Sequence, residues 1–279
     1  MTAQPTLIAQ ISDLHVKPPG ELAYGHIDTA TAVARCVGKL NRLAPRPELV
    51  VVSGDLVDTP LAEEYEHLRG LLAPLEIPLA LVPGNHDARA PMRAAFPEQL
   101  YAAKSGALNL ALELARLDVV LLDSSVPGEP HGELDAETLG WLDASLAASP
   151  TRPALLFLHH PPFLTGIRHM DAQNLRNAHA FAAVLRRHPR VRLVAAGHIH
   201  RPVLTLFAGI AASICPSPNH AVALDLGEPR PPSLKLEAPG FHLHAWFPGE
   251  TYGDVVTHFV ALGDSDGPHP LRGRRDDAT

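Results

Sequence analysis

The sequence predicts an α/β fold in which two β-sheets pack together and helices cover their outer faces. Two patterns indicate this fold class. Over the first two thirds of the chain, buried apolar runs alternate with amphipathic segments, as strands with helical crossovers do. After Arg201, short apolar stretches are separated by Pro and Gly, which is typical of antiparallel strands. The chain has 279 residues, of which 46% are hydrophobic, enough to bury a large core.

The strands of the first two thirds are short and rich in β-branched residues. The apolar runs predict strands over residues 6–11, 49–52, 79–82, 154–158 and 191–196, and a strand pair over 108–114 and 119–122.

Between these strands, helices are predicted over 61–73 and 174–187, and two more begin after an aspartate that can act as N-cap. Asp28 precedes Val33, Val37 and Leu40, which recur at i, i+4 and i+7. Asp135 precedes Leu139, Leu142 and Leu146, and Leu134 is placed to form a hydrophobic staple with Leu139.

The last third predicts a run of antiparallel strands over 203–207, 210–214, 221–226, 234–236, 241–247 and 255–262. No flexible linker interrupts the chain, so we expect one domain over residues 1–262. Residues 203–262 could cap the core or form a subunit interface. Residues 263–279 are polar and are expected to form a disordered tail.

Composition argues against several classes of protein. The net charge of −7 and the pI near 6.2 disfavour non-specific binding to nucleic acid or to an anionic membrane. No apolar run is long enough to span a bilayer, and the N-terminal segment lacks the features of a secretory signal. Cys36 and Cys215 are too few for a disulfide scaffold, so we expect a cytoplasmic protein. The 17 histidines would suit a metal-dependent hydrolase.

Metal-ligand residues follow each of five predicted strands. The five segments are Ser12-Asp13-Leu14-His15, Ser53-Gly54-Asp55, Gly84-Asn85-His86-Asp87, His159-His160 and Gly197-His198-Ile199-His200. Since ligands bind beyond the carboxyl ends of strands in open α/β sheets, five ends of one parallel sheet are expected to face one crevice. Oxygen and nitrogen ligands without a thiolate suit Mn, Fe, Co or Zn. Each motif alone is weak, but their ordered recurrence predicts a metal site.

The ordered motifs, together with AQISDLH at 9–15, YGHID at 24–28, VVVSGD at 50–55 and LHHPP at 158–162, resemble those of the calcineurin-like metallophosphoesterases. Within that superfamily they are most similar to the class III cyclic-nucleotide phosphodiesterase branch and its bacterial glycerophosphodiesterases. The resemblance covers residues 6–262 and implies a four-layer αββα sandwich of two mixed sheets with a two-metal centre. It also implies a homo-oligomer, a dimer or larger.

The resemblance assigns a role to each matching position. Asp13, His15 and His200 would hold the first metal, Asn85, His159 and His198 the second, and Asp55 would bridge both. His160, the second member of its pair, would lie outside the ligand set.

Four further histidine and aspartate positions concern the substrate. His86 would donate a proton to the leaving group, and Asp87 would keep His86 charged, cap the following helix, or do both. His26 and His220 would face the substrate, although His220 could equally be an ordinary loop residue. Asp58 is followed by Thr59-Pro60 rather than the Arg-Gly of the protein serine/threonine phosphatases, which disfavours that subfamily.

The predicted activity is hydrolysis of small phosphodiesters by a hydroxide that bridges the two metals. A centre with two divalent ions, two carboxylates and a hydroxide keeps a charge of about +1, matching a diester monoanion. Glycerophosphodiesters and 3′,5′-cyclic nucleotides such as cAMP both remain candidates. A metal-dependent nuclease, a broad-specificity phosphomonoesterase and a non-catalytic metal-binding scaffold are the alternatives.

Overall fold

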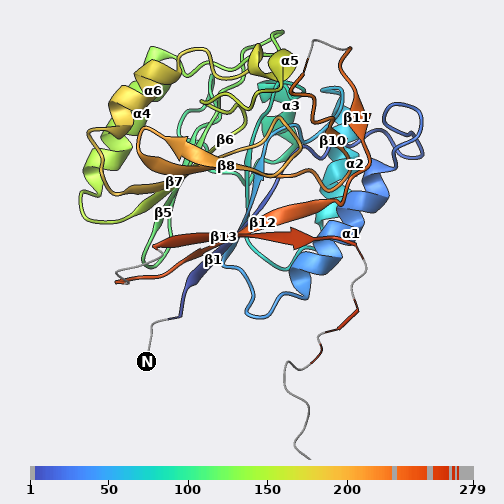
Figure 1. Cartoon of the computed structure of the whole chain (residues 1–279), viewed down its shortest axis with the longest axis horizontal. Helices are drawn as coiled ribbons and strands as arrows, with labels where there is room; N and C mark the ends of the chain where they lie inside the picture. The colour runs from blue at the N-terminus through green and yellow to red at the C-terminus, as the bar shows by residue number, and fades with distance from the viewer. Residues whose placement is uncertain (1–3, 228–230, 250–253, 264–265, 268, 270–279) are drawn as a thin grey trace, which may run out of the picture.

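The computed structural model describes residues 4–227, 231–249, 254–263, 266–267 and 269, and contains two sheets packed face to face (Figure 1). The first sheet has the order β13-β12-β1-β2-β3 and the second β4-β5-β6-β7-β9-β8. The strands of the first sheet are β1 (Thr6–Ile11), β2 (Leu49–Ser53), β3 (Leu79–Val82), β12 (Gly240–Trp246) and β13 (Val255–Ala261). Those of the second are β4 (Leu110–Glu113), β5 (Asp118–Leu122), β6 (Ala154–Leu158), β7 (Val191–Ala196), β8 (Val203–Phe207) and β9 (Ile210–Ile214).

Helices cover the outer face of each sheet. Against the first sheet lie α1 (Thr29–Asn41), α2 (Ala62–Leu72) and α3 (Arg89–Ala95), and against the second lie α4 (Ala136–Ala148) and α6 (Ala178–Leu185). The short helix α5 (Arg168–Asp171) lies in the connection that follows β6. The four-layer αββα sandwich is therefore confirmed.

Alternation along the strands builds three apolar layers. In β2, Val50 and Val52 face the helices, while Leu49 and Val51 face the second sheet. Phe157 of β6 meets Val51 in the layer between the sheets. Every residue of β2 is buried, because both faces of this strand are covered.

The C-terminal strands complete both sheets. β12 pairs antiparallel with β1, and β13 pairs antiparallel with β12 at the edge of the first sheet. β8 and β9 extend the second sheet, and β10 (Ala221–Val222) pairs with β11 (Leu234–Lys235) as a small hairpin. The prediction of antiparallel pairing throughout this region was wrong for β9, which runs parallel to β7.

Both predicted aspartate caps are confirmed. The carboxylate of Asp28 accepts a hydrogen bond from the Thr31 backbone N–H at 2.9 Å, and that of Asp135 accepts one from Thr138 at 2.7 Å. The helix predicted over 174–187 is shorter, since α6 starts only after Asn177. The side-chain amide oxygen of Asn177 accepts a hydrogen bond from the Leu134 backbone N–H, so this side chain anchors a loop instead of capping or extending the helix. Helices α3 and α5 were not predicted.

Among the described residues, none of the helices combines the length and apolar character that a bilayer crossing needs. The tail predicted over 263–279 lies largely outside the described residues. Cys36 and Cys215 are buried free thiols.

Candidate metal centre

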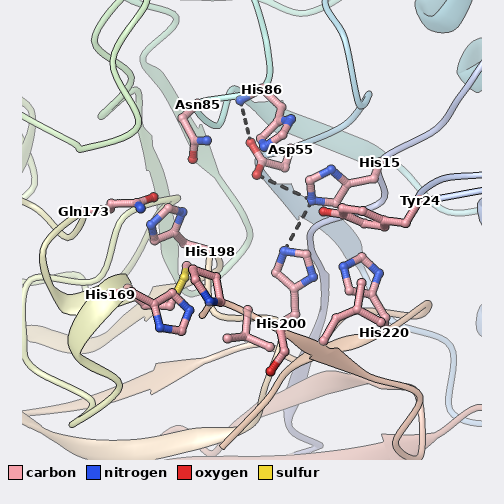
Figure 2. A pocket seen from close by; sticks show the side chains of 15 residues that line it. His15, Tyr24, Asp55, Asn85, His86, His169, Gln173, His198, His200 and His220 are labelled. Atoms are coloured by element: carbon pink, nitrogen blue, oxygen red, sulfur yellow. Dashed lines mark hydrogen bonds and ion pairs between the residues drawn. The ribbon is translucent and has the colours of Figure 1, made fainter. Parts of the chain in front are cut away.

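The predicted ligands converge where the carboxyl ends of five strands meet. Three of these strands, β1, β2 and β3, belong to the first sheet, and β6 and β7 belong to the second. The prediction that all five belong to one sheet was therefore wrong. The face-to-face packing of the sheets brings both sets of strand ends to a single pocket, which Figure 2 shows from close by.

One group of donors gathers around His15. Its Nε2 lies 3.2 Å from Nε2 of His200 and 3.6 Å from Oδ2 of Asp55. His200 Nε2 lies 3.4 Å from Oδ1 of Asp13. All four residues are buried, so these donors are shielded from bulk water.

A second group gathers around His159. Its Nε2 lies 3.2 Å from Oδ1 of Asn85, 3.3 Å from Nδ1 of His198 and 3.3 Å from the same Oδ2 of Asp55. Asp55 Oδ2 is thus close to both groups.

These spacings fit metal coordination. Bonds of about 2.0–2.1 Å to a shared ion place neighbouring ligand atoms about 3.0–3.4 Å apart. Most of the donor separations in both groups fall in that range, and in each group two imidazole nitrogens face each other. The donor set of imidazoles, carboxylates and one amide suits a divalent transition metal. The residues present therefore fit two metal ions that share Asp55.

Hydrogen bonds hold the ligands in the required orientation. The Nδ1–H of His159 donates to the Ser53 carbonyl at 2.9 Å, which leaves the Nε2 lone pair free for a metal. The backbone N–H of His86 donates to Asp55 Oδ1 at 2.9 Å, which turns Oδ2 toward the two groups. The backbone N–H of His198 donates to Asp13 at 2.9 Å and so joins the ligand loops of β1 and β7.

Gly54 is required for this packing. It has a φ of +96°, and a Cβ at this position would lie 2.3 Å from Nδ1 of His159. Only glycine allows the loop after β2 to pass so close to the ring.

Backbone strain is concentrated at the candidate ligands. Asp13, His15, Asp55, His198 and His200 all have left-handed φ angles, between 45° and 73°. This conformation is unfavourable for residues with a side chain and persists only where the surrounding structure imposes it. In the described part of the chain only Tyr24 and Ala208 share it among non-glycine residues, so the strain marks this site.

The electrostatics of the site couple proton and metal binding. Burial raises the pKa of Asp13 to about 6. Burial has the same effect on Asp55, but the neighbouring His159 outweighs it and holds the pKa of that carboxyl well below its usual value. Burial disfavours the imidazolium of His159, yet Asp55 raises its pKa to about 9. A metal at His159 Nε2 must displace this proton, so metal affinity should rise with pH.

His86 lines the pocket, but Asp87 makes no hydrogen bond to its ring. The Nδ1–H of His86 donates to the backbone carbonyl of Asp58 at 2.8 Å. Asp87 instead accepts hydrogen bonds from the backbone N–H groups of Leu56 and Gly84 and from the Tyr65 hydroxyl. Helix α3 starts after Ala88 without a side-chain cap. The helix-cap role of Asp87 was therefore wrong, and its carboxylate hydrogen-bonds backbone N–H groups and the Tyr65 hydroxyl rather than His86.

The pocket has a volume of about 410 Å³, and His220 is among the residues that line it. The His220 ring is 4.5 Å from that of His200 and 5.3 Å from that of Tyr24. His26, which was expected to face the substrate, is not among the residues that line this pocket. Its ring is exposed and bonds the Tyr24 carbonyl, and the left-handed Tyr24 turns its own side chain to the pocket instead.

Sequence reasoning missed Tyr24, His169 and Gln173 in this pocket. Tyr24 stood within the YGHID motif, but no sequence pattern pointed to the other two. His160 is buried behind His159, with its Nδ1 2.8 Å from the Ser124 hydroxyl.

Comparison with known proteins agrees with this geometry. The family model described as calcineurin-like phosphoesterase matches residues 6–202. The chain belongs to the calcineurin-like phosphoesterase family. Among curated members, a protein of Arcobacter nitrofigilis named "Probable glycerophosphodiester phosphodiesterase GpdQ" is 36% identical over 266 residues, 95% of this chain and 96% of its own length.

A second family member is a 3′,5′-cyclic-nucleotide phosphodiesterase of Nostoc sp., which is 34% identical over 71% of this chain and 72% of its own length. Among solved structures, a dimetal phosphatase from Danio rerio superposes with a TM-score of 0.67 at 17% identity, covering 94% of this chain and 98% of the other. This superposition shows that the two proteins share the same fold.

Proposed function

We propose that this protein is a two-metal phosphodiesterase that hydrolyses small phosphodiesters. One observation carries the proposal: Oδ2 of Asp55 lies 3.6 Å from His15 Nε2 and 3.3 Å from His159 Nε2, at the junction of two buried donor groups. Family membership and the names of the two curated relatives support the reaction class.

Each group would hold one divalent ion. Asp13, His15 and His200 hold the first, Asn85, His159 and His198 the second, and Asp55 contributes to both. When bound, such ions clamp the phosphate and make a nucleophile available near neutral pH. Fe, Mn, Co and Zn all accept these ligands.

His86 acts as the proton donor to the departing alcohol. Because its Nδ1–H is held by the Asp58 carbonyl, the proton that it loses comes from Nε2, on the opposite edge of the ring. The remaining neutral tautomer keeps its hydrogen bond to Asp58, so the ring stays in place through the transfer. The His86 ring also lies edge-on against His15, with centroids 4.7 Å apart, which keeps it beside the first metal position.

The charge of the site favours a diester. Two divalent ions bring about +4, and Asp13 and Asp55 bring about −2, so the loaded centre attracts a phosphodiester anion. Glycerophosphodiesters and 3′,5′-cyclic nucleotides are both candidate substrates, in keeping with the names of the two relatives. Neither nucleic acid nor a membrane is proposed as a partner, given the net charge of −7.

The decisive experiment compares steady-state hydrolysis of cAMP, glycerophosphocholine and bis(p-nitrophenyl) phosphate after reconstitution with Mn. We expect turnover of the aryl diester and of at least one of the two natural diesters, and loss of both activities in Asp55→Ala. Faster hydrolysis of p-nitrophenyl phosphate than of every diester would favour a phosphomonoesterase. Degradation of DNA at a comparable rate would favour a nuclease.

We also propose a cellular location and an oligomeric state. Cys36 and Cys215 are buried free thiols, which supports a cytoplasmic location. The edge strand β8 exposes Leu204 and Leu206, which supports self-association into a dimer or larger assembly.

A further inference from the structure

Two polar side chains of the pocket have no hydrogen-bond partner among the residues that the structure describes. His169 and Gln173 are half-buried and line the cavity that contains the candidate metal ligands. Neither side chain makes a hydrogen bond or ion pair with any described residue. Half-buried polar groups that face a cavity and lack an internal partner are available to bind a ligand.

Internal hydrogen bonds hold the segment that carries them in a closed loop. Oδ1 of Asp171 accepts hydrogen bonds from the Thr165 backbone N–H at 2.7 Å and hydroxyl at 2.8 Å, and Oδ2 accepts one from Gly166 at 2.9 Å. The Asn174 side chain donates to the Phe163 carbonyl at 2.8 Å. These bonds close the loop around α5, so His169 and Gln173 are held in position rather than placed on a free surface loop.

A third contact ties this segment to the metal ligands. The Leu175 backbone N–H donates to the Pro161 carbonyl, two residues after His159, at 3.0 Å. The turn continues past α5, since the Gln173 backbone N–H donates to the Met170 carbonyl at 2.8 Å. His169 and Gln173 are four residues apart on this turn, and both point into the pocket.

The pocket has two unlike sides (Figure 2). On one side, the rings of His86, His15, His220 and Tyr24 lie in a chain of contacts with centroids 4.7, 5.8 and 5.3 Å apart. The proposed proton donor belongs to this side, so the departing alcohol lies there.

The other side is next to the second metal position. In the view of Figure 2, His169 and Gln173 line the same side of the pocket as Asn85 and His198, and Tyr24 and His220 line the other. In a phosphodiester whose leaving group faces His86, the ester group that stays on phosphorus extends toward this side. The neutral amide of Gln173 can both donate to and accept from a hydroxyl group, and the imidazole of His169 offers one donor and one acceptor when neutral.

We propose that His169 and Gln173 form a specificity subsite that hydrogen-bonds hydroxyl groups on the retained ester of the substrate. This proposal rests on the proposed phosphodiesterase function and adds which part of the substrate the enzyme reads. A retained polyol such as glycerol satisfies the two side chains, whereas an alkyl group of the same length leaves both without partners. The subsite therefore favours substrates whose retained alcohol carries vicinal hydroxyls.

The test uses two diesters with the same leaving group, 2,3-dihydroxypropyl p-nitrophenyl phosphate and n-propyl p-nitrophenyl phosphate. They differ only in the hydroxyls of the retained ester. We expect the native enzyme to prefer the dihydroxypropyl diester in kcat/KM. Gln173→Leu and His169→Phe, which keep shape and remove the polar atoms, should each reduce that preference roughly fivefold, the effect of one hydrogen bond. Turnover of the n-propyl diester should change little.

His179→Phe is the matched control, since His179 is exposed on α6 and does not line this pocket. It should leave the preference unchanged. Metal content and hydrolysis of bis(p-nitrophenyl) phosphate report on the fold and on the metal centre of each variant. A second readout is product inhibition. Gln173→Leu should bind glycerol 3-phosphate more weakly than the native enzyme does, and should bind n-propyl phosphate with unchanged affinity.

The outcomes separate the two proposals. If the native enzyme hydrolyses both diesters equally, or if Gln173→Leu and His169→Phe slow both substrates by the same factor, the subsite is disproved and the phosphodiesterase function stands. If the metal-loaded native enzyme hydrolyses neither diester, the proposed function itself fails and the subsite fails with it.

Discussion

Gly54→Ala should selectively remove the second metal position. A Cβ at residue 54 would lie 2.3 Å from Nδ1, 2.6 Å from Cγ and 2.8 Å from Cβ of His159. Restoring an ordinary contact of 3.4 Å requires the ring to move by about 1 Å. That displacement breaks the bond from His159 to the Ser53 carbonyl and spoils the spacing to Asn85 and His198.

The expected effects are large because metal sites tolerate distance errors of only about 0.2 Å. We expect Gly54→Ala to retain a single metal per chain and to lose about 100-fold or more in kcat/KM. Because φ is +96° at this position, backbone strain in the variant should lower the free energy of unfolding by about 1–3 kcal/mol. Elemental analysis, steady-state kinetics and urea denaturation measure the three effects.

Gly140→Ala provides the matched control. Gly140 lies inside α4, and an added Cβ would meet no atom within 4 Å. This substitution should raise the free energy of unfolding by about 0.5–1 kcal/mol and leave metal content and activity intact. If Gly54→Ala instead retained two metals per chain and native turnover, the second metal position would not depend on the close approach of the loop after β2 to His159.

Three further predictions follow from the site and the core. Asp55→Ala should abolish metal binding at both positions because Oδ2 serves both donor groups, and elemental analysis showing two bound metals would refute the shared role. His86→Ala should keep both metals and lose most turnover of alkyl diesters while an activated aryl diester suffers less, and an equal loss on both would exclude proton donation. His242 in β12 is buried, which lowers its pKa to about 4, so the unfolded chain takes up a proton below pH 6.5 that the folded chain does not. Between pH 6.5 and 5, the free energy of unfolding of the metal-free protein should fall by about 1.6 kcal/mol more than that of His242→Gln, measured by urea denaturation. Identical pH dependence in the two proteins would contradict this account.

The residues of the candidate metal centre could be found in the sequence because each follows a strand whose apolar run is clear. The run Leu49–Ser53 is apolar and β-branched, and Gly54-Asp55 come directly after it. Such patterns involve only residues that are close in the sequence, so they can be recognised without knowledge of the fold. The N-caps Asp28 and Asp135 were predictable for the same reason, since each bonds a residue three positions away.

The substrate side of the pocket could not be predicted in this way. Asp87 was assigned to His86 or to a helix cap, but it faces Leu56 and Tyr65 from other elements. His26 was chosen over Tyr24 because sequence alone does not give the left-handed turn at Tyr24. In both cases the direction of a side chain depends on backbone conformation in a loop.

The sequence by itself determined the two-sheet α/β class, the order of the strands along the chain and the identity of the residues that can bind metal. These properties follow from the local periodicity of apolar residues and from the chemistry of the side chains, both of which are visible in short stretches of sequence. Only the tertiary structure decided that β1, β2 and β3 meet β6 and β7 from a different sheet, and that Asp55 stands between two donor groups. Tertiary structure also brought His169 and Gln173 to the pocket. Contacts between distant segments arise from the packing of the two sheets, and no pattern of neighbouring residues encodes them.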